Sequence, residues 1–232
     1  MINRIIAWLA DVTHWQGDDG ILRRIVEHLE YSVAALVIAA LIAIPLGLYI
    51  GHTGRGRFLV VSAVGAARAI PSLGLLYLSF FWLAPRLSGE IAFLAPAGLV
   101  LVVLAIPPIL SGAYAGVEGV EPAARDAAVG MGMRGTEVMR HVELPCALPL
   151  ILSGMRSAML QVIATATIAA VLSLGGLGRF LIDGLASQDF PQTASGAILV
   201  AVLALAVDMV FALVQRSVVS PGLTGRYGKV SL

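Results

Sequence analysis

The segment Glu121–Pro145, with the sequence EPAARDAAVGMGMRGTEVMRHVELP, is a charged stretch in the middle of a strongly apolar chain. Pro122 suits the first position of a helix, where its missing N–H costs nothing, and the alanines after it favour helix. Glycines then loosen this helix, and Thr136 is suited to cap a second helix that stops before Pro145. The segment therefore predicts two short helices joined by a glycine elbow.

The first of these helices has an apolar face of small side chains. Positions three and four residues apart share one side of a helix, which here groups Ala124, Ala127, Ala128 and Met131. Such a shallow surface fits either the groove of another protein or an ordinary interfacial loop. The pattern alone leaves both interpretations open.

The rest of the chain has the composition of a membrane protein. Of its 232 residues, 59% are hydrophobic and 12% are charged, whereas soluble domains carry about 25% charged residues. The net charge of +1 gives no reason to expect a nucleic acid partner. The single cysteine, Cys146, excludes a disulfide within this chain and a cysteine-based zinc site. We therefore expect an all-α, polytopic integral membrane protein.

Apolar windows give the expected membrane spans. With about 20 mostly apolar residues per span, about five windows qualify: Leu29–Ile50, Phe58–Leu83, Ile91–Tyr114, Leu148–Leu174 and Thr193–Val214. Arg68 and Pro71 interrupt the second window, and Pro107 and Pro108 interrupt the third. Such breaks persist in a membrane where neighbouring helices or a cavity satisfy the freed backbone groups, so we expect a bundle that encloses a pathway.

The distribution of basic residues predicts the orientation of the chain. The side that holds Glu121–Pro145 carries more of them: Arg55, Arg57, Arg125, Arg134, Arg140, Arg216, Arg226 and Lys229. The other side carries Arg4, Arg23, Arg24, Arg86 and Arg179. Because basic residues concentrate on the cytoplasmic side, the N-terminus is expected outside and the C-terminus inside the cell.

These expectations divide the chain into three parts. Residues 1–28 form an extracytoplasmic or interfacial segment, in which an interfacial helix places Trp8 and Trp15 at the level of the lipid headgroups. Residues 29–216 form the transmembrane domain, which contains the polar loop 115–146. Residues 217–232 form a cytoplasmic tail.

The spacing within the polar loop resembles a known signature. The loop carries, in order, Asp126-Ala127-Ala128, Gly132, Val142 and Leu144-Pro145. Permeases of ATP-binding-cassette importers carry Glu-Ala-Ala, Gly, an aliphatic residue and Leu-Pro at the same offsets. Asp126 departs from the glutamate of that pattern, which keeps the charge and shortens the reach of the side chain.

The resemblance extends over nearly the whole chain and is weakest at the N-terminus. The matching segments are RAIPSLGLL (68–76), DAAVGMGM (126–133), VELPCALPLILSGMRSA (142–158), ATATIAAVLSLGGLG (164–178) and LALAVD (203–208). Together they resemble the permeases of the glycine betaine, carnitine and choline branch, which import compatible solutes under osmotic stress.

This resemblance implies a type I importer permease fold in the cell membrane, whose loop forms cytoplasmic coupling helices that dock on a separate ATPase. The residues implied for that contact are Glu121, Ala124, Asp126, Ala127, Ala128, Gly132, Val142, Leu144 and Pro145. It also implies two further partners, an extracytoplasmic substrate-binding protein and a second permease subunit, identical or related. The expected function is ATP-driven uptake of solutes of the glycine betaine, carnitine, choline and proline betaine class.

The chain itself lacks the pattern of an ATP site. A P-loop needs a glycine, four residues, Gly-Lys and then Ser or Thr. The single lysine, Lys229, is followed by Val230, and the first glycine position holds Leu223. ATP-driven work is therefore expected to depend on another polypeptide. The scattered histidines lack the spacing of a catalytic or metal site, so we expect no catalytic residue, cofactor or metal.

Charged residues inside the expected spans are costly and normally face protein or water. Arg68, Arg156 and Asp208 occupy such positions, and we expect Asp208 to pair with Arg156 or Arg68. A packing role is favoured over a transport role, since buried pairs often only specify an arrangement. The fourth span is rich in small residues, which suits either close helix packing or the lining of a pathway. The pathway candidates there are Gln161, Thr165 and Ser173.

Three alternative functions remain open from the sequence. A permease for another small solute, such as methionine, is the nearest alternative. A passive channel would keep working when the partner ATPase loses its catalytic glutamate. An intramembrane enzyme is the most distant alternative and would turn over a substrate as the purified chain alone.

Overall fold

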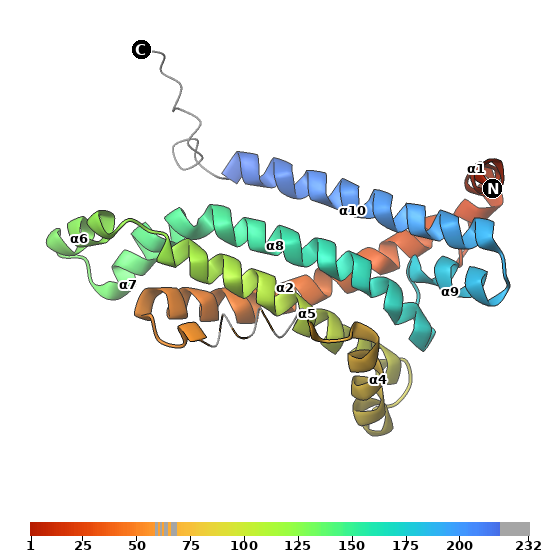
Figure 1. Ribbon diagram of the computed structural model, residues 1–232, viewed down its shortest axis with the longest axis horizontal. Coiled ribbons are helices and arrows are strands. Elements are labelled where there is room, and N and C mark those ends of the chain that lie inside the picture. Colours follow the sequence, from red (N-terminus) through yellow and green to blue (C-terminus); the bar gives the residue numbers. More distant parts are fainter. Residues whose placement is uncertain (59, 61, 63–64, 66–68, 219–232) are drawn as a thin grey trace, which may run out of the picture. The chain divides into compact units, whose positions relative to one another are not determined.

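The structure is a computed structural model of the chain and describes residues 1–58, 60, 62, 65 and 69–218. Within these residues, all regular secondary structure is helical. The longest helices in Figure 1 are α2 (Ile21–Thr53), α5 (Ile91–Glu118), α8 (Leu144–Ala166) and α10 (Phe190–Val218). Each of them, α8 together with its flanking turns, is long and apolar enough to cross a membrane. The all-α, multi-pass membrane fold expected from the sequence is therefore confirmed.

Shorter elements connect these helices. Before α2 lie α1 (Ile2–Ala10) and the 3₁₀ turn η1 (Val12–Trp15), and before α5 lie α4 (Ser72–Leu83) and η2 (Ala84–Arg86). Between α5 and α8 lie α6 (Pro122–Gly130), α7 (Gly135–Val138) and the π-helical turn η3 (Met139–Glu143). After α8 follow the 3₁₀ segment η4 (Thr167–Leu172) and α9 (Gly178–Ala186).

The chain divides into two compact units. The first unit comprises Met1–Ile38, Ile70–Ala105 and Met159–Val207. The second unit comprises Ala39–Ala69, Ile106–Ala158 and Asp208–Leu232. Every one of the long helices contributes residues to both units.

In the second unit, α5 packs against both α2 and α8 through positions without a side chain. A Cβ atom on Gly47 of α2 would lie 2.6 Å from the Cβ atom of Ala113, and one on Gly112 of α5 would lie 2.5 Å from the Leu150 carbonyl oxygen. Small residues let membrane helices approach this closely. The buried residues Ala113, Val117, Ala147 and Ile151 form the core of these contacts.

Prolines do not interrupt α5. The sequence predicted a break at Pro107 and Pro108, but the helix runs from Ile91 to Glu118 without one, so that prediction is wrong. A membrane helix tolerates proline where its neighbours cover the freed backbone groups. Here α8 approaches so closely that a Cβ atom on Gly154 would lie 2.6 Å from the Pro108 carbonyl oxygen.

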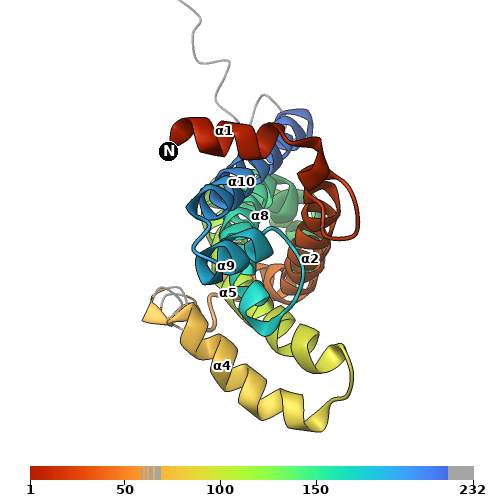
Figure 2. The ribbon, with the colours of Figure 1, turned by 90° about the vertical axis from the view of Figure 1, so that its right-hand side faces the viewer.

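The core of the first unit lies where α4, α5 and η4 meet. Its buried residues are Leu76, Ala97, Val100, Leu104, Ala169, Leu172 and Leu174. The hydroxyl of Ser79 on α4 donates to the Pro96 carbonyl oxygen of α5 at 3.3 Å. Helix α9 lies beside the first part of α10 (Figure 2), where a Cβ atom on Gly196 would lie 2.7 Å from Leu181 Cδ1.

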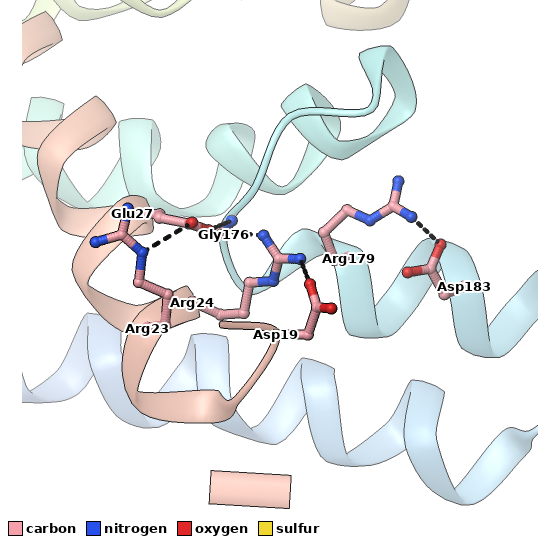
Figure 3. A network of polar contacts seen from close by, with 7 residues as sticks. All are labelled: Asp19, Arg23, Arg24, Glu27, Gly176, Arg179 and Asp183. Atoms are coloured by element: carbon pink, nitrogen blue, oxygen red, sulfur yellow. Dashed lines mark hydrogen bonds and ion pairs between the residues drawn. The ribbon is translucent and has the colours of Figure 1, made fainter. Parts of the chain in front are cut away.

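A polar network holds the beginning of α2 in the same unit (Figure 3). The Glu27 carboxylate accepts from Arg24 at 2.8 Å, pairs with Arg23 at 3.3 Å and accepts from the backbone N–H of Gly176 at 2.8 Å. Arg24 also pairs with Asp19. We call Glu27, Arg23, Arg24, Asp19 and Gly176 the Glu27 network. It ties α2 to the turn between η4 and α9.

The described helices differ in extent from the expected spans. Helix α2 begins at Ile21, whereas the first expected span begins at Leu29, and the charged side chains of Arg23, Arg24 and Glu27 in the added part belong to the Glu27 network. The second expected span, Phe58–Leu83, lies partly outside the described residues. Its described part is α4, which begins directly after Pro71.

The N-terminal segment folds back on itself. The ring of His14 stacks on Trp8 with 4.2 Å between centroids, and Trp15 Nε1 donates to the Leu9 carbonyl oxygen at 2.8 Å. Helix α1 has no buried residue and carries apolar and polar side chains on different sides. These features suit the interfacial position expected for it, which stays a prediction.

Candidate functional site

The loop between α5 and α8 contains two short helices. Pro122 occupies the first turn of α6, where the sequence placed it. The elbow between the helices contains Gly132, whose φ of +90° is a conformation that favours glycine. The backbone N–H of Met133 closes the end of α6 by donating to the Ala128 carbonyl oxygen at 3.1 Å.

The second helix differs from its expected bounds. Thr136 does not cap it: α7 begins at Gly135, and the N-cap is Arg134, whose backbone N–H donates to Glu137 Oε2 at 2.7 Å. The helical backbone also does not stop before Pro145, because η3 leads directly into α8 at Leu144. Proline is tolerated in the first turn of a helix, where no N–H is needed, so Leu144-Pro145 begins α8.

The expected apolar face of α6 is divided in two. Ala128 is buried, with 1% of its surface exposed, whereas Met131 is 73% exposed. Ala124 and Ala127 are exposed as well. The four residues therefore do not form one face: Ala128 anchors the helix to its own chain, while the other three remain accessible.

A buried carboxylate lies at the base of this loop. Glu143 is 2% exposed, and its two oxygens are bound by different side chains. Oε1 accepts from Arg125 Nε of α6 at 2.7 Å, and Oε2 contacts His52 Nδ1, near the end of α2, at 2.6 Å. We call Glu143, Arg125 and His52 the Glu143 cluster. It lies within the second unit and joins segments that are far apart in sequence.

Two further contacts extend the Glu143 cluster. Arg125 also donates through Nη2 to the Val117 carbonyl oxygen, near the end of α5. The ring of His52 lies beside Gly135, the first residue of α7, where a Cβ atom would be 3.4 Å from His52 Nε2. The cluster thus touches α2, α5, α6, α7, and η3 immediately before α8.

The sequence analysis missed all three members of the Glu143 cluster. Arg125 and Glu143 lie inside the signature yet match none of its fixed positions. One signal was available for Glu143: it is an acidic residue flanked by aliphatic Val142 and Leu144 at the start of an apolar span. His52 is 91 residues away from Glu143, and no local pattern connects the two.

A second charged pair lies in the same unit. Arg156 of α8 and Asp208 of α10 form a two-pronged ion pair, with Nε–Oδ1 and Nη2–Oδ2 distances of 2.5 Å. The predicted pairing of Asp208 with Arg156 is therefore confirmed. Gln215 Nε2 adds a contact between the same helices by donating to the Pro149 carbonyl oxygen at 3.3 Å. Arg68, the other expected partner, lies outside the described residues.

The pathway candidates occupy different surroundings. Gln161 is exposed on α8. Thr165 lines a small apolar cavity in the first unit together with Leu76, Val100 and other residues of α4, α5 and η4. Ser173 is exposed and adopts the left-handed conformation, with a φ of 62°, directly after η4. The structure leaves their role in transport as a prediction.

Among the described residues, no group of three or more His, Cys, Asp and Glu side chains is arranged to hold a metal ion. The Glu143 cluster contains one carboxylate and one imidazole, and an arginine occupies its third position. Arg125 balances the charge of the buried Glu143 carboxylate, and the cluster contains no second carboxylate that could bind a cation. The geometry fits a structural contact within the loop.

Comparison with known proteins shows that the chain is similar to components of transport systems. The sequence model of a family described as binding-protein-dependent transport system inner membrane component matches residues 43–220. The chain is 34% identical to the glycine betaine/carnitine/choline transport system permease protein OpuCB of Bacillus subtilis, over 86% of this chain and 88% of that protein. It is 32% identical to the choline transport system permease protein OpuBB of Bacillus subtilis, over 88% and 90%.

Solved structures have a similar fold. An inward-facing form of the MetNI methionine ABC transporter matches with a TM-score of 0.71 and 20% identity, over 86% of this chain and 96% of that chain. An amino acid ABC transporter with histidines matches with a TM-score of 0.67 and 20% identity, over 85% of this chain and 93% of that chain.

Proposed function

Because the chain belongs to the family of binding-protein-dependent transport system inner membrane components, we propose that it is the permease subunit of an ATP-driven importer for compatible solutes. The proposed solutes are those of the glycine betaine, carnitine, choline and proline betaine class. The names of the similar Bacillus subtilis permeases support this class. The chain itself would form the pathway and hydrolyse no ATP.

The observation that carries this proposal is the construction of the loop 115–146. It presents a short exposed helix, α6, in which the Val129 side chain is 59% exposed, followed directly by Met131, which is 73% exposed, while the buried Glu143 holds the base of the loop. Apolar side chains that stay exposed beside polar residues on an anchored loop support a contact with a protein partner. We propose that cytoplasmic ATPase subunits bind here.

The contacts that we propose for this partner follow the signature of the loop. The contact residues we propose are Glu121, Ala124, Asp126, Ala127, Gly132, Val142, Leu144 and Pro145, with Ala128 as an inward anchor rather than a direct contact. Asp126 is exposed, which suits a contact with a basic group on the ATPase. Ala128, at 1% exposure, is the one member whose surroundings favour the anchoring role.

The remaining partners follow from this assignment. We propose that the loop and the tail 217–232 face the cytoplasm, that residues 1–28 face outward, and that the transmembrane domain is 29–216. A substrate-binding protein would deliver solute to the outer side. A second permease subunit, identical or related, would complete the pathway, for which Arg68, Gln161, Thr165 and Ser173 remain candidates. The Arg156–Asp208 pair would fix α8 against α10 in each subunit.

Uptake by the full assembly in proteoliposomes tests the proposal. The chain, its ATPase, the second permease and the binding protein are reconstituted, and accumulation of radiolabelled betaine, carnitine, choline and methionine is measured with ATP inside. We expect ATP-dependent accumulation of at least one of the first three solutes. Replacement of the catalytic glutamate of the ATPase should abolish it.

Other outcomes would change the assignment. Uptake of methionine alone would identify a permease for a different solute. Solute flux that continues with the inactive ATPase would indicate a passive channel. Turnover of a solute by the purified chain alone would indicate an enzyme.

A further inference from the structure

We propose that Glu143 is a positioning residue that fixes the α6–α7 loop to the ends of α2 and α5, so that these segments move together when the loop is displaced. This inference rests on the proposed function for its consequence in transport. The contacts that carry it lie within the second unit.

The Glu143 side chain is held at both of its carboxylate oxygens. Its carboxylate is 2% exposed, and each of its oxygens has its own partner, Arg125 at 2.7 Å and His52 at 2.6 Å. A buried carboxylate that loses a partner is left with an uncompensated charge, so the two contacts resist separation far more than exposed pairs do. The cluster is therefore a strong connection between α6 and the end of α2.

The Arg125 side chain makes two contacts at once. Its Nε binds Glu143, and its Nη2 binds the carbonyl oxygen of Val117, one residue before α5 ends. The last carbonyl groups of a helix have no partner inside the helix and attract cations. A planar guanidinium presents its donors to the two acceptors in a fixed fork, whereas the single ammonium of a lysine is a point charge without that geometry. Arg125 thus links α6, α5 and η3 in one contact.

Helix α7 begins beside the Glu143 cluster. The ring of His52 lies between Glu143 and Gly135, and a Cβ atom on Gly135 would be 3.4 Å from His52 Nε2. The first residue of α7 therefore abuts the same side chain that binds the carboxylate. Both short helices of the loop are connected to the cluster, α6 through Arg125 and α7 through His52.

The short helices need this connection. Helix α6 has 9 residues and α7 has 4, and isolated helices shorter than about 12 residues are marginal in water. Most of α6 is exposed, and Ala128 is its one buried residue. A force applied to α6 by a partner would distort a loosely held loop, whereas the Glu143 cluster transfers it to α2 and α5.

Substitution of Glu143 by glutamine in the complete assembly tests the proposal. Glu143→Gln keeps the size of the side chain and removes its charge. We expect ATP hydrolysis to continue while the amount of solute imported per ATP falls about tenfold. Such a factor is typical of the coupling between two sites in one protein. Arg125→Gln should act in the same direction.

The matched control is Arg57→Gln. Arg57 and Glu118 form another Arg–Glu pair in the same unit, at 3.2 Å, but their side chains are 68% and 44% exposed. We expect this variant to import the same amount of solute per ATP as the wild type. Arg125→Lys, which keeps the positive charge but not the fork, should lower the ratio less than Arg125→Gln.

Hydrogen exchange on the reconstituted permease gives a readout that does not depend on transport. Backbone amides of residues 122–138 should exchange faster in Glu143→Gln and keep their rate in Arg57→Gln. Unchanged exchange there, or an unchanged ratio of solute to ATP in both Glu143→Gln and Arg125→Gln, would overturn the proposal. If the wild-type assembly shows no ATP-driven uptake, the proposed function fails, and the exchange rates still decide whether Glu143 holds the loop.

Discussion

The Glu143 cluster and the Glu27 network each hold a connecting segment through one glutamate, yet they do so under different conditions. The Glu143 side chain is 2% exposed and has two side-chain partners. The Glu27 side chain is 14% exposed, has two arginines and a backbone N–H as partners, and one of those arginines is 55% exposed. Solvent can replace a lost partner of Glu27 but not one of Glu143.

This difference separates two kinds of polar contact in one chain. In the Glu27 network the acceptor is shared among several donors, so the loss of one donor leaves the others in place. In the Glu143 cluster every contact joins a different segment, and a loss disconnects that segment. We expect the energetic cost of single substitutions to follow this division.

Glu143→Ala should have the largest effect, because it leaves Arg125 and His52 without their buried acceptor. Breaking a buried pair by removing one partner costs about 3 kcal/mol or more. A fall in the midpoint of thermal unfolding, measured on the purified permease in lipid nanodiscs, checks this. In the double variant Glu143→Ala/Arg125→Ala the combined loss should be smaller than the sum of the single losses; additive losses would contradict a shared contact.

Gly175→Val should come next. A Cβ atom at Gly175 would lie 2.0 Å from Glu27 Oε2, so the turn or the glutamate must shift, at a cost of about 1–3 kcal/mol for an overpacked site. The same unfolding measurement applies. Glu27→Ala removes the obstructing carboxylate, and the double variant should recover part of the loss; no recovery would mean that the clash lies elsewhere.

Glu27→Gln should have a smaller effect than Glu143→Gln. The amide oxygen can still accept from Gly176, and Arg24 keeps its pair with Asp19. We expect a loss of about 1 kcal/mol, the net value of a typical hydrogen bond. Equal losses for Glu27→Gln and Glu143→Gln would remove the distinction between the two sites.

Arg23→Gln should have the smallest effect. This side chain is 55% exposed and lies 3.3 Å from Glu27, and an exposed pair within one helix contributes about 0.5 kcal/mol or less. The stability of this variant should stay within error of the wild type at 0.5 M salt. A loss as large as that of Glu27→Gln would show that Arg23 holds the turn.

The sequence predicted the features that depend on composition and local spacing. The apolar windows predicted the long helices, and the position of Pro122 predicted the start of α6. An ion pair of Asp208 with Arg156 or Arg68 was predictable because charges inside apolar spans need a partner, but the sequence did not choose between the two arginines. The N-cap of α7 lies two residues before the expected Thr136, because the capping contact comes from Glu137 and the Arg134 backbone rather than from a Thr136 side chain.

Features that depend on the folded chain were not predictable in this way. His52 and Glu143 are 91 residues apart in sequence, so the spacing of residues within one helix cannot predict their contact. The contact between Glu27 and Gly176 likewise joins residues that are 149 positions apart in sequence. Ala128 shares its helical spacing with exposed neighbours, yet it is buried in the folded chain.

The π-helical turn η3 also sets the rotational phase between the loop and α8. A π turn holds one residue more than an α turn, and each residue of an α-helix advances the chain by about 100° around the axis. Residues Met139–Glu143 therefore rotate everything before them relative to a continuous helix. Deleting one of these residues would swing the side chains of α7 about a quarter turn or more, so the direction in which the loop faces depends on this single extra residue.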